Sequence, residues 1–333
     1  MTFSSSSYKH FLERGPFFLA PLLFFLGTTG SSRSPVTEHS ISVDAQAKIA
    51  VTANLVVLPV KVTNPRGTFV SGLKLQDFRV YEDGKLQNLT VFEDGDTPVT
   101  VGLVVDHSRS MGSKLPDVIS AVSSFAHSSN PQDEMFVVDF NDDVTIEIMK
   151  GKPFSNNAKE LEHALTAVSA RGRTALYDAV SEGLKHLQYG RWEKKALIVI
   201  SDGGDNASHL KYSQVRVQAR QSQALIYSIA LLGALEEEDP KVLLRLCRDT
   251  GGIAYFPKAG DHVADISTEI ARDLREQYTL GYIPRQMNGA SSFRKVEVKV
   301  TAPDRDKLRI RTRPGYLPVA EKQATTPPGS ASR

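Results

Sequence analysis

From Val99 onward, short apolar runs alternate with amphipathic segments of helical spacing, and this alternation constrains the fold more than any other feature of the chain. The predicted strands are Val99–Val105, Met135–Phe140, Val144–Ile148, Ala196–Ser201, Ala224–Leu231 and Ile253–Phe256. The predicted helices cover Leu115–Ser128, 161–168, 176–187, Ser213–Gln223, Pro240–Asp249 and Val263–Glu276. Alternating strands and helices predict an α/β domain with a doubly wound, mostly parallel sheet, in which only Val144–Ile148 runs antiparallel to its neighbour.

Two β-rich segments, 49–96 and 278–318, flank this α/β region. In the first, Asp83-Gly84 predicts a hairpin turn, and Leu86–Phe92 is the expected return strand. In the second, the predicted strands are Tyr278–Ile283, Phe293–Val300 and Leu308–Arg313. Each segment is too small to bury a core by itself. We therefore expect the N- and C-terminal segments to pack together as an additional β-sandwich-like domain.

The N-terminus has the pattern of a secretory signal. Lys9 and Arg14 precede the apolar run Phe17–Leu26, which small residues follow. We expect a signal peptide over 1–30 and a polar linker over 31–48, with an uncleaved anchor or an apolar start without structure as alternatives. The run is short for a bilayer span, so we expect an exported protein with no stable membrane span in the mature chain. Its predicted location is periplasmic, cell-surface or extracellular, and the polar tail 319–333 is predicted to be disordered.

The composition is that of an ordinary globular protein, with 41% hydrophobic residues, 23% charged residues and a formal net charge of +2. The basic residues form no stripe, so nucleic acid is not an expected partner. The single cysteine, Cys247, lies in an apolar helical pattern and is predicted to be a buried small hydrophobe. One cysteine cannot form an internal disulfide.

Oxygen-bearing side chains gather where the predicted strands end. Asp106, Ser108 and Ser110 follow the first strand at a spacing of two residues, which can direct one carboxylate and two hydroxyls toward one point. Asp202 follows another apolar strand, and Thr174 precedes a helical pattern. Hard oxygen ligands suit Mg²⁺, Mn²⁺ or Ca²⁺. The alternative is structural, with the two serines as helix caps and Asp202 as a turn residue.

The pattern Asp106-x-Ser108-x-Ser110 resembles the metal-ion-dependent adhesion site of von Willebrand factor type A (VWA) domains. Thr174 and Asp202 occupy the remaining positions of that site in the expected order. The line Asp77–Gly84 and the line Tyr278–Pro284 look like recurring lines of bacterial VWA-related proteins. The resemblance implies a Rossmann-like VWA domain over 97–277, between the β segments 49–96 and 278–318.

The resemblance also implies the role of each site residue. Ser108 and Ser110 would hold the ion directly, and Thr174 directly or through water. Asp106 and Asp202 would act through waters or, for one of them, directly. The expected ion is Mg²⁺, with Mn²⁺ or Ca²⁺ as alternatives, and an acidic side chain of a protein partner would complete the shell.

Five residues near the predicted site need interpretation. His107 and Arg109 fill the variable positions of the motif and are expected to point away from the ion. Alternatively, Arg109 recruits an acidic partner beside the metal, and Arg171 and Arg173 add to this positive rim. The other interpretation of Arg171 and Arg173 is that they are only solvated residues of a loop. Asp205 is expected to be a turn residue, and the alternative is that it bonds to a water outside the direct ligands of the ion.

We do not expect an enzyme. Asp106, His107 and Ser108 include the residue types of a hydrolytic triad, but side chains of adjacent residues do not converge as the triad requires. The sequence contains no Gly-x-Ser-x-Gly, His-Glu-x-x-His or phosphate-binding Gly-x-x-x-x-Gly-Lys motif. Metal-dependent protein binding is therefore the predicted function. The alternatives are a structural or assembly component in which the ion only stabilises the fold, and a metal-assisted hydrolase.

Overall fold

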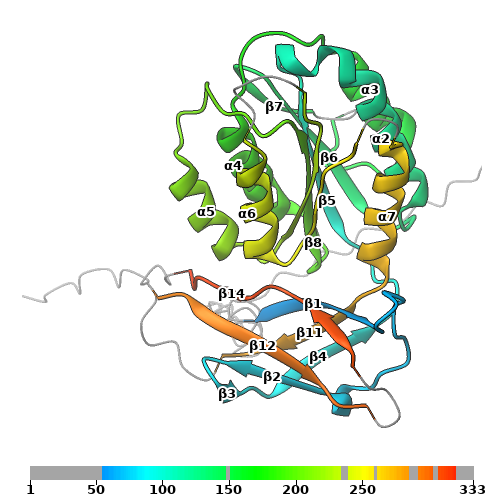
Figure 1. Ribbon diagram of the computed structural model, residues 1–333, viewed down its shortest axis with the longest axis vertical. Helices are drawn as coiled ribbons and strands as arrows, with labels where there is room; N and C mark the ends of the chain where they lie inside the picture. The colour runs from blue at the N-terminus through cyan, green and yellow to red at the C-terminus, as the bar shows by residue number, and fades with distance from the viewer. Residues whose placement is uncertain are drawn as a thin grey trace, which may run out of the picture. The chain divides into compact units, whose positions relative to one another are not determined.

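The computed structural model describes residues 55–147, 151–233, 239–258, 261–284, 292–302 and 307–319 (Figure 1). All of them belong to one unit that spans Ala47–Arg333. The predicted signal 1–30, the linker 31–48, the start of the first β segment and the tail beyond residue 319 lie outside the described residues. Within those described ranges, no helix is both long and apolar enough to cross a membrane.

A six-stranded sheet forms the centre of the α/β part, in the order β10-β9-β8-β5-β6-β7. Its strands are β5 (Thr100–Asp106), β6 (Glu134–Phe140), β7 (Val144–Glu147), β8 (Lys195–Ser201), β9 (Leu225–Ala230) and β10 (Ala254–Tyr255). Neighbouring strands run parallel except for the antiparallel pair β6 and β7. Every residue of β5 is buried, as expected for a strand covered on both faces.

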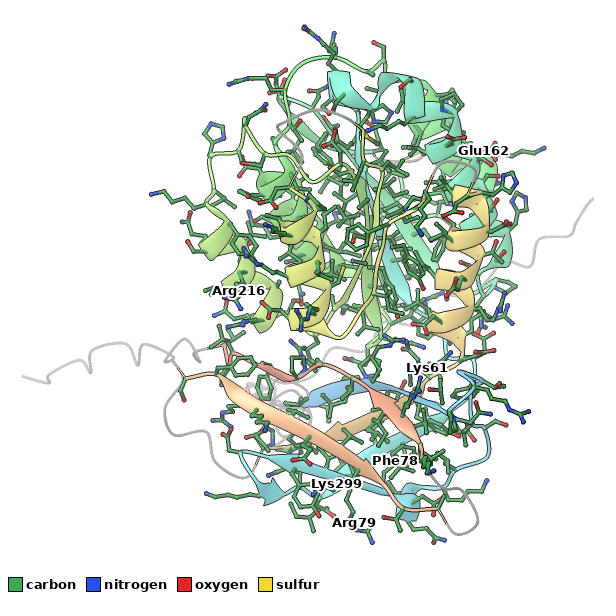
Figure 2. The ribbon with its side chains drawn as sticks, in the orientation of Figure 1. Lys61, Phe78, Arg79, Glu162, Arg216 and Lys299 are labelled. Atoms are coloured by element: carbon green, nitrogen blue, oxygen red, sulfur yellow. The ribbon has the colours of Figure 1, made fainter. Side chains whose placement is uncertain are left out.

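Helices cover both faces of this sheet (Figure 1). They are α2 (Leu115–Ser128), α3 (Ala158–Thr166), α4 (Leu176–His186), α5 (Tyr212–Gln221), α6 (Pro240–Thr250) and α7 (Val263–Arg275). Figure 1 shows α4, α5 and α6 on one face and α2 and α7 on the other. Side chains fill the layers between sheet and helices (Figure 2), and the buried apolar ones form one continuous core.

The helix boundaries follow local sequence signals. α2 begins at Leu115, so Pro116 falls in the first turn, where its missing N–H costs no hydrogen bond. α6 begins after Asp239, whose side chain accepts a hydrogen bond from the backbone N–H of Lys241. These two helices match their predicted ranges to within one residue.

The remaining strands form two antiparallel sheets of four strands each, ordered β13-β1-β11-β4 and β14-β12-β2-β3. They are β1 (Val56–Thr63), β2 (Phe78–Glu82), β3 (Lys85–Leu86), β4 (Leu89–Asp94), β11 (Tyr278–Tyr282), β12 (Arg294–Val300), β13 (Arg309–Arg311) and β14 (Gly315–Tyr316). N- and C-terminal strands are interleaved, because β11 pairs with both β1 and β4.

These strands share a second hydrophobic core, distinct from that of the α/β part. Phe78 of β2 and Tyr278 of β11 are both buried there, with ring centroids 5.0 Å apart. Figure 2 labels Phe78 in this core and Lys299 on β12, whose side chain is exposed. The α/β sheet and the β-sandwich-like part confirm the predicted fold class.

The predicted return strand Leu86–Phe92 is wrong as a single element. The hairpin turn at Asp83-Gly84 is present, with φ of 47° and 77°, and joins β2 to β3. The chain then leaves this sheet, and β4 pairs with β11 in the other one. The apolar pattern did not reveal the break because Leu86 of β3 is apolar although it is exposed, while Leu89 and Phe92 of β4 pack against the second core.

Candidate metal centre

Asp106 ends β5 and is fully buried. Its Oδ1 accepts a hydrogen bond from the backbone N–H of Ser108 at 2.8 Å, and its Oδ2 accepts one from the Ser201 hydroxyl at 2.6 Å. Ser201 ends β8, the neighbour of β5 in the sheet. Asp106 therefore orients the turn that carries the two serines and connects it to the adjacent strand.

The two serines of the motif lie against Asp202. The hydroxyls of Ser108 and Ser110 are 3.1 Å apart, and the Ser110 hydroxyl donates to Asp202 Oδ2 at 2.6 Å. Asp202 directly follows β8, so parallel pairing of β5 and β8 brings both aspartates to one end of the sheet. This end lies where the chain order reverses on either side of β5, the usual place for a ligand site in such sheets.

Thr174 reaches this end of the sheet through backbone hydrogen bonds. Its N–H donates to Asn206 Oδ1 at 2.9 Å, and its carbonyl accepts from the N–H groups of Asn206 and Ala207. The segment before Thr174 also bonds to the loop that follows β5. The Arg171 N–H donates to the His107 carbonyl at 2.9 Å. In the described part of the chain, no hydrogen bond joins the Thr174 hydroxyl to the other four predicted ligands.

Burial dominates the electrostatics of the site. Desolvation raises the pKa of the Asp106 carboxyl to about 6, against the lowering effect of its bonds from Ser108 and Ser201, and the nearby charge of Asp202 adds to the rise. Lys114 Nζ lies 4.0 Å from Asp202 Oδ2. The buried carboxylates of Asp106 and Asp202 are therefore close enough to interact, and the Lys114 ammonium lies near Asp202.

The donor set fits a hard divalent cation. Asp106 and Asp202 supply negative charge, while Ser108 and Ser110 supply neutral oxygens at hydrogen-bond distance from one another. Across the described ranges, no three His, Cys, Asp or Glu side chains gather as a metal site. Oxygen ligands without imidazole or thiolate suit Mg²⁺, Mn²⁺ or Ca²⁺ rather than zinc or copper.

The residues at the variable positions have distinct surroundings. His107 is fully buried, and its Nδ1 lies against the Asp139 carboxylate on β6. Arg109 and Arg171 are exposed, and no hydrogen-bond or ion-pair partner of either guanidinium lies among the described residues. Arg173 is paired, because its Nε donates to Asp142 Oδ1 at 2.9 Å. Within the described part of the chain, Arg109 and Arg171 are therefore the members of the predicted rim whose charges have no partner.

Asp205 has a structural role. Its Oδ1 accepts hydrogen bonds from the Ser208 hydroxyl and from the N–H of Tyr177, in the first turn of α4. The N-cap residue of α4 is Ala175, whose side chain makes no hydrogen bond to the first turn of the helix. The loop after β8 thus caps α4, the helix that follows Thr174. Burial raises the pKa of the Asp205 carboxyl.

Three contributors were not singled out from the sequence. They are Ser201, which donates to Asp106, Asn206, which binds the Thr174 backbone, and Lys114 beside Asp202. Ser201 and Asn206 had a weak signal, because both lie in the polar stretch that begins at the end of an apolar strand. Lys114 had none, since its contact depends on the packing of three separate segments.

Comparisons with known proteins agree with this fold. A family model described as the von Willebrand factor type A domain matches residues 101–204. This range runs from β5 to the loop after β8 and contains all five predicted ligands. No curated protein matches the chain at a significant level.

Solved structures show similarity at low identity. A von Willebrand factor type A protein from Catenulispora acidiphila is 10% identical, with a TM-score of 0.47 and coverage of 80% of this chain and 75% of that one. An aerotolerance-related membrane protein from Bacteroides fragilis is 13% identical, with a TM-score of 0.43 and coverage of 53% and 98%. The pilus adhesin SpaC from Lactobacillus rhamnosus is 12% identical, with a TM-score of 0.44 and coverage of 77% and 49%. Residues 101–204 of the chain therefore match the von Willebrand factor type A domain family.

Proposed function

We propose that this protein is an exported, non-catalytic binding module that holds a divalent cation and uses it to bind a protein partner. The ligands would be Asp106, Ser108, Ser110, Thr174 and Asp202. The observation that carries the proposal is the contact between the Ser110 hydroxyl and Asp202 Oδ2, 2.6 Å apart although the residues belong to different loops. Mg²⁺ is the proposed ion, with Mn²⁺ or Ca²⁺ as alternatives.

The roles follow from charge and burial. Asp106 and Asp202 balance the charge of the cation, while the hydroxyls of Ser108 and Ser110 complete the shell without adding charge. When bound, the cation would supply a Lewis-acidic position that an acidic side chain of a partner could occupy. Ser201 and Asn206 act as positioning residues, because they bond to Asp106 and to the Thr174 backbone.

The rim supports an acidic partner. Arg109 and Arg171 are exposed beside the site, on segments joined by the bond from Arg109 N–H to the Gly172 carbonyl at 3.3 Å. Two guanidinium groups near a divalent cation favour a partner surface with more than one carboxylate. We expect Arg109→Gln and Arg171→Gln to weaken partner binding more than Arg173→Gln, because Asp142 already pairs with Arg173.

A second candidate is a structural role for the ion. The three loops already bond to one another through Ser110, Thr174 and Asn206, so a cation there could serve only to stabilise the fold. In that case Mg²⁺ would raise the melting temperature. At a hundredfold excess of Mg²⁺ over its dissociation constant, the free energy of unfolding would increase by about 2.7 kcal/mol. No partner would then respond to Mg²⁺.

Isothermal titration of Mg²⁺ tests the site itself. We expect saturable binding to the full chain that Asp106→Asn abolishes and the matched control Glu297→Gln, on the exposed face of β12, leaves unchanged. Equal binding by all three proteins would overturn the proposal.

A pull-down from the native envelope tests the use of the ion. We expect a partner that is captured in Mg²⁺, is released by EDTA and is not captured by Asp106→Asn. If EDTA lowers only the melting temperature and releases nothing, the structural alternative is correct.

A further inference from the structure

Lys114 is held beside the candidate metal centre from two directions. It is the last residue of the 3-10 helix Arg109–Lys114 and its side chain is 19% exposed. Its Nζ donates to the Leu231 carbonyl at 2.5 Å and lies 4.0 Å from Asp202 Oδ2. Leu231 directly follows β9, and its N–H bonds to the Ser201 carbonyl on β8.

The same contacts restrict where the ammonium can go. The Leu231 carbonyl belongs to a segment that is hydrogen-bonded to the neighbouring strand, so it offers a fixed acceptor. Asp202 Oδ2 is also the oxygen that accepts from Ser110. The positive charge of Lys114 is therefore located next to one of the two carboxylates that a divalent cation needs.

A fixed positive charge at this place has opposite effects on two states of the protein. Without a divalent cation, it offsets the repulsion between the Asp106 and Asp202 carboxylates. With a divalent cation held by those carboxylates, the ammonium and the ion would carry like charges and repel each other. One side chain thus stabilises the metal-free protein and weakens metal binding.

We propose that Lys114 is an internal competitor for the divalent cation and sets the affinity of the site. This inference rests on the proposed metal-binding function. Lys114 is not a ligand. It acts through its charge on Asp202, so that the site fills only when the cation concentration is high enough to overcome an ammonium already present.

A structural role alone would have a different signature. If Lys114 only tethers the Leu231 carbonyl, its removal destabilises the protein equally with and without the cation, and affinity falls or stays the same. If Lys114 is a competitor, its removal destabilises the cation-free protein but strengthens cation binding. Affinity and stability measured together therefore separate the two roles.

The test compares three variants of the full chain with the original protein. Lys114→Met removes the charge at similar length, and Lys114→Arg keeps it. Lys185→Met is the matched control, because Lys185 is an exposed lysine at the far end of α4, paired only with Glu182 among the described residues. The dissociation constant for Mn²⁺ is measured by electron paramagnetic resonance, and the melting temperature is measured in EDTA and in saturating Mg²⁺.

We expect Lys114→Met to bind Mn²⁺ on the order of tenfold more tightly, as removal of a like charge near a divalent ion implies. Lys114→Arg and Lys185→Met should bind like the original protein. The melting temperature of Lys114→Met should fall in EDTA, and the deficit should shrink or reverse in Mg²⁺. Unchanged or weaker Mn²⁺ binding by Lys114→Met, or equal deficits in both conditions, would overturn the proposal.

The outcome also distinguishes the inference from the function on which it rests. If the original protein binds no Mn²⁺ but Lys114→Met does, the competitor role stands and the proposed function fails at ordinary cation concentrations. If neither protein binds Mn²⁺, both are overturned.

Discussion

The hydroxyl of Ser110 donates a hydrogen bond of 2.6 Å to the carboxylate of Asp202, a residue 92 positions further along the chain. Ser110 lies in the 3-10 helix after β5, and Asp202 directly follows β8. The contact exists because β5 and β8 are parallel neighbours, so that both strands end at the same edge of the sheet. It joins the first and last parts of the predicted metal site.

Replacing Ser110 tests this contact. Ser110→Ala removes one neutral oxygen of the candidate shell, and we expect Mg²⁺ affinity to fall roughly tenfold or more, as for loss of a bond to a charged group. The matched control is Ser113→Ala, an exposed serine in the same 3-10 helix. Isothermal titration gives both dissociation constants. Equal losses in the two variants would mean that the helix, rather than the Ser110 hydroxyl, matters.

Gly203 tests how tightly the loop after Asp202 is packed. Its φ is +86°, and a Cβ there would lie 2.6 Å from the backbone carbonyl oxygen of Asp239. Gly67 has nearly the same φ, +85°, with open space around it. Both alanine variants carry the strain of positive φ, but only Gly203→Ala adds an overlap, which should cost about 1–3 kcal/mol more. Chemical denaturation measures the difference, and equal losses would contradict the overlap.

Glu82 connects the two chain segments of the β-sandwich-like part. Its carboxylate accepts from Arg294, Tyr282 and Tyr316, each at 2.8 Å, and both charged side chains are 7% exposed. Glu82→Gln leaves Arg294 buried without a counter-charge, which should cost about 3–5 kcal/mol. Glu297→Gln breaks an exposed pair with Lys299 and should cost no more than about 1 kcal/mol. Urea titrations of the two variants would refute this if their losses were similar.

Lys194 makes stability depend on pH in the alkaline range. Its Nζ donates to the Leu274 carbonyl, and burial lowers its pKa to about 8, although Asp133 acts in the opposite direction. Between about pH 8 and 10 the unfolded chain keeps this proton more than the folded protein does. The contribution of Lys194 to the free energy of unfolding therefore increases as pH rises, with a slope of at most about 1.4 kcal/mol per pH unit.

The measurement is the free energy of unfolding of the original protein and of Lys194→Met at several pH values. Other buried groups act oppositely, since burial raises the pKa of the Cys247 thiol to about 12. Their effects cancel in the difference between the two proteins. We expect that difference to grow in favour of the original protein between pH 8 and 10, and a constant difference would exclude the role of Lys194.

Local patterns were sufficient for most elements of the fold. The helix at Leu115–Ser128 has the predicted bounds, and β5 and β8 lie within one residue of their predicted ranges. Apolar periodicity and capping residues act over a few positions, so they can be read from sequence. The return strand after Asp83-Gly84 could not be predicted correctly, because its first part, β3, pairs with β2, whereas its second part, β4, pairs with β11 of the C-terminal segment.

The sequence by itself determined which oxygen-bearing residues end the strands, the alternation that builds a wound sheet, and the chemistry that a hard cation would find there. Only the tertiary structure decided that β5 and β8 are neighbours, that Ser110 contacts Asp202 and that Lys114 lies beside Asp202. It also decided that Asp142 pairs with Arg173, whereas Arg109 and Arg171 have no such partner among the described residues. The physical reason is the separation along the chain of the residues that interact. Secondary structure depends on neighbours along the chain, whereas strand order, burial and ion pairing depend on segments that meet only after the chain has folded.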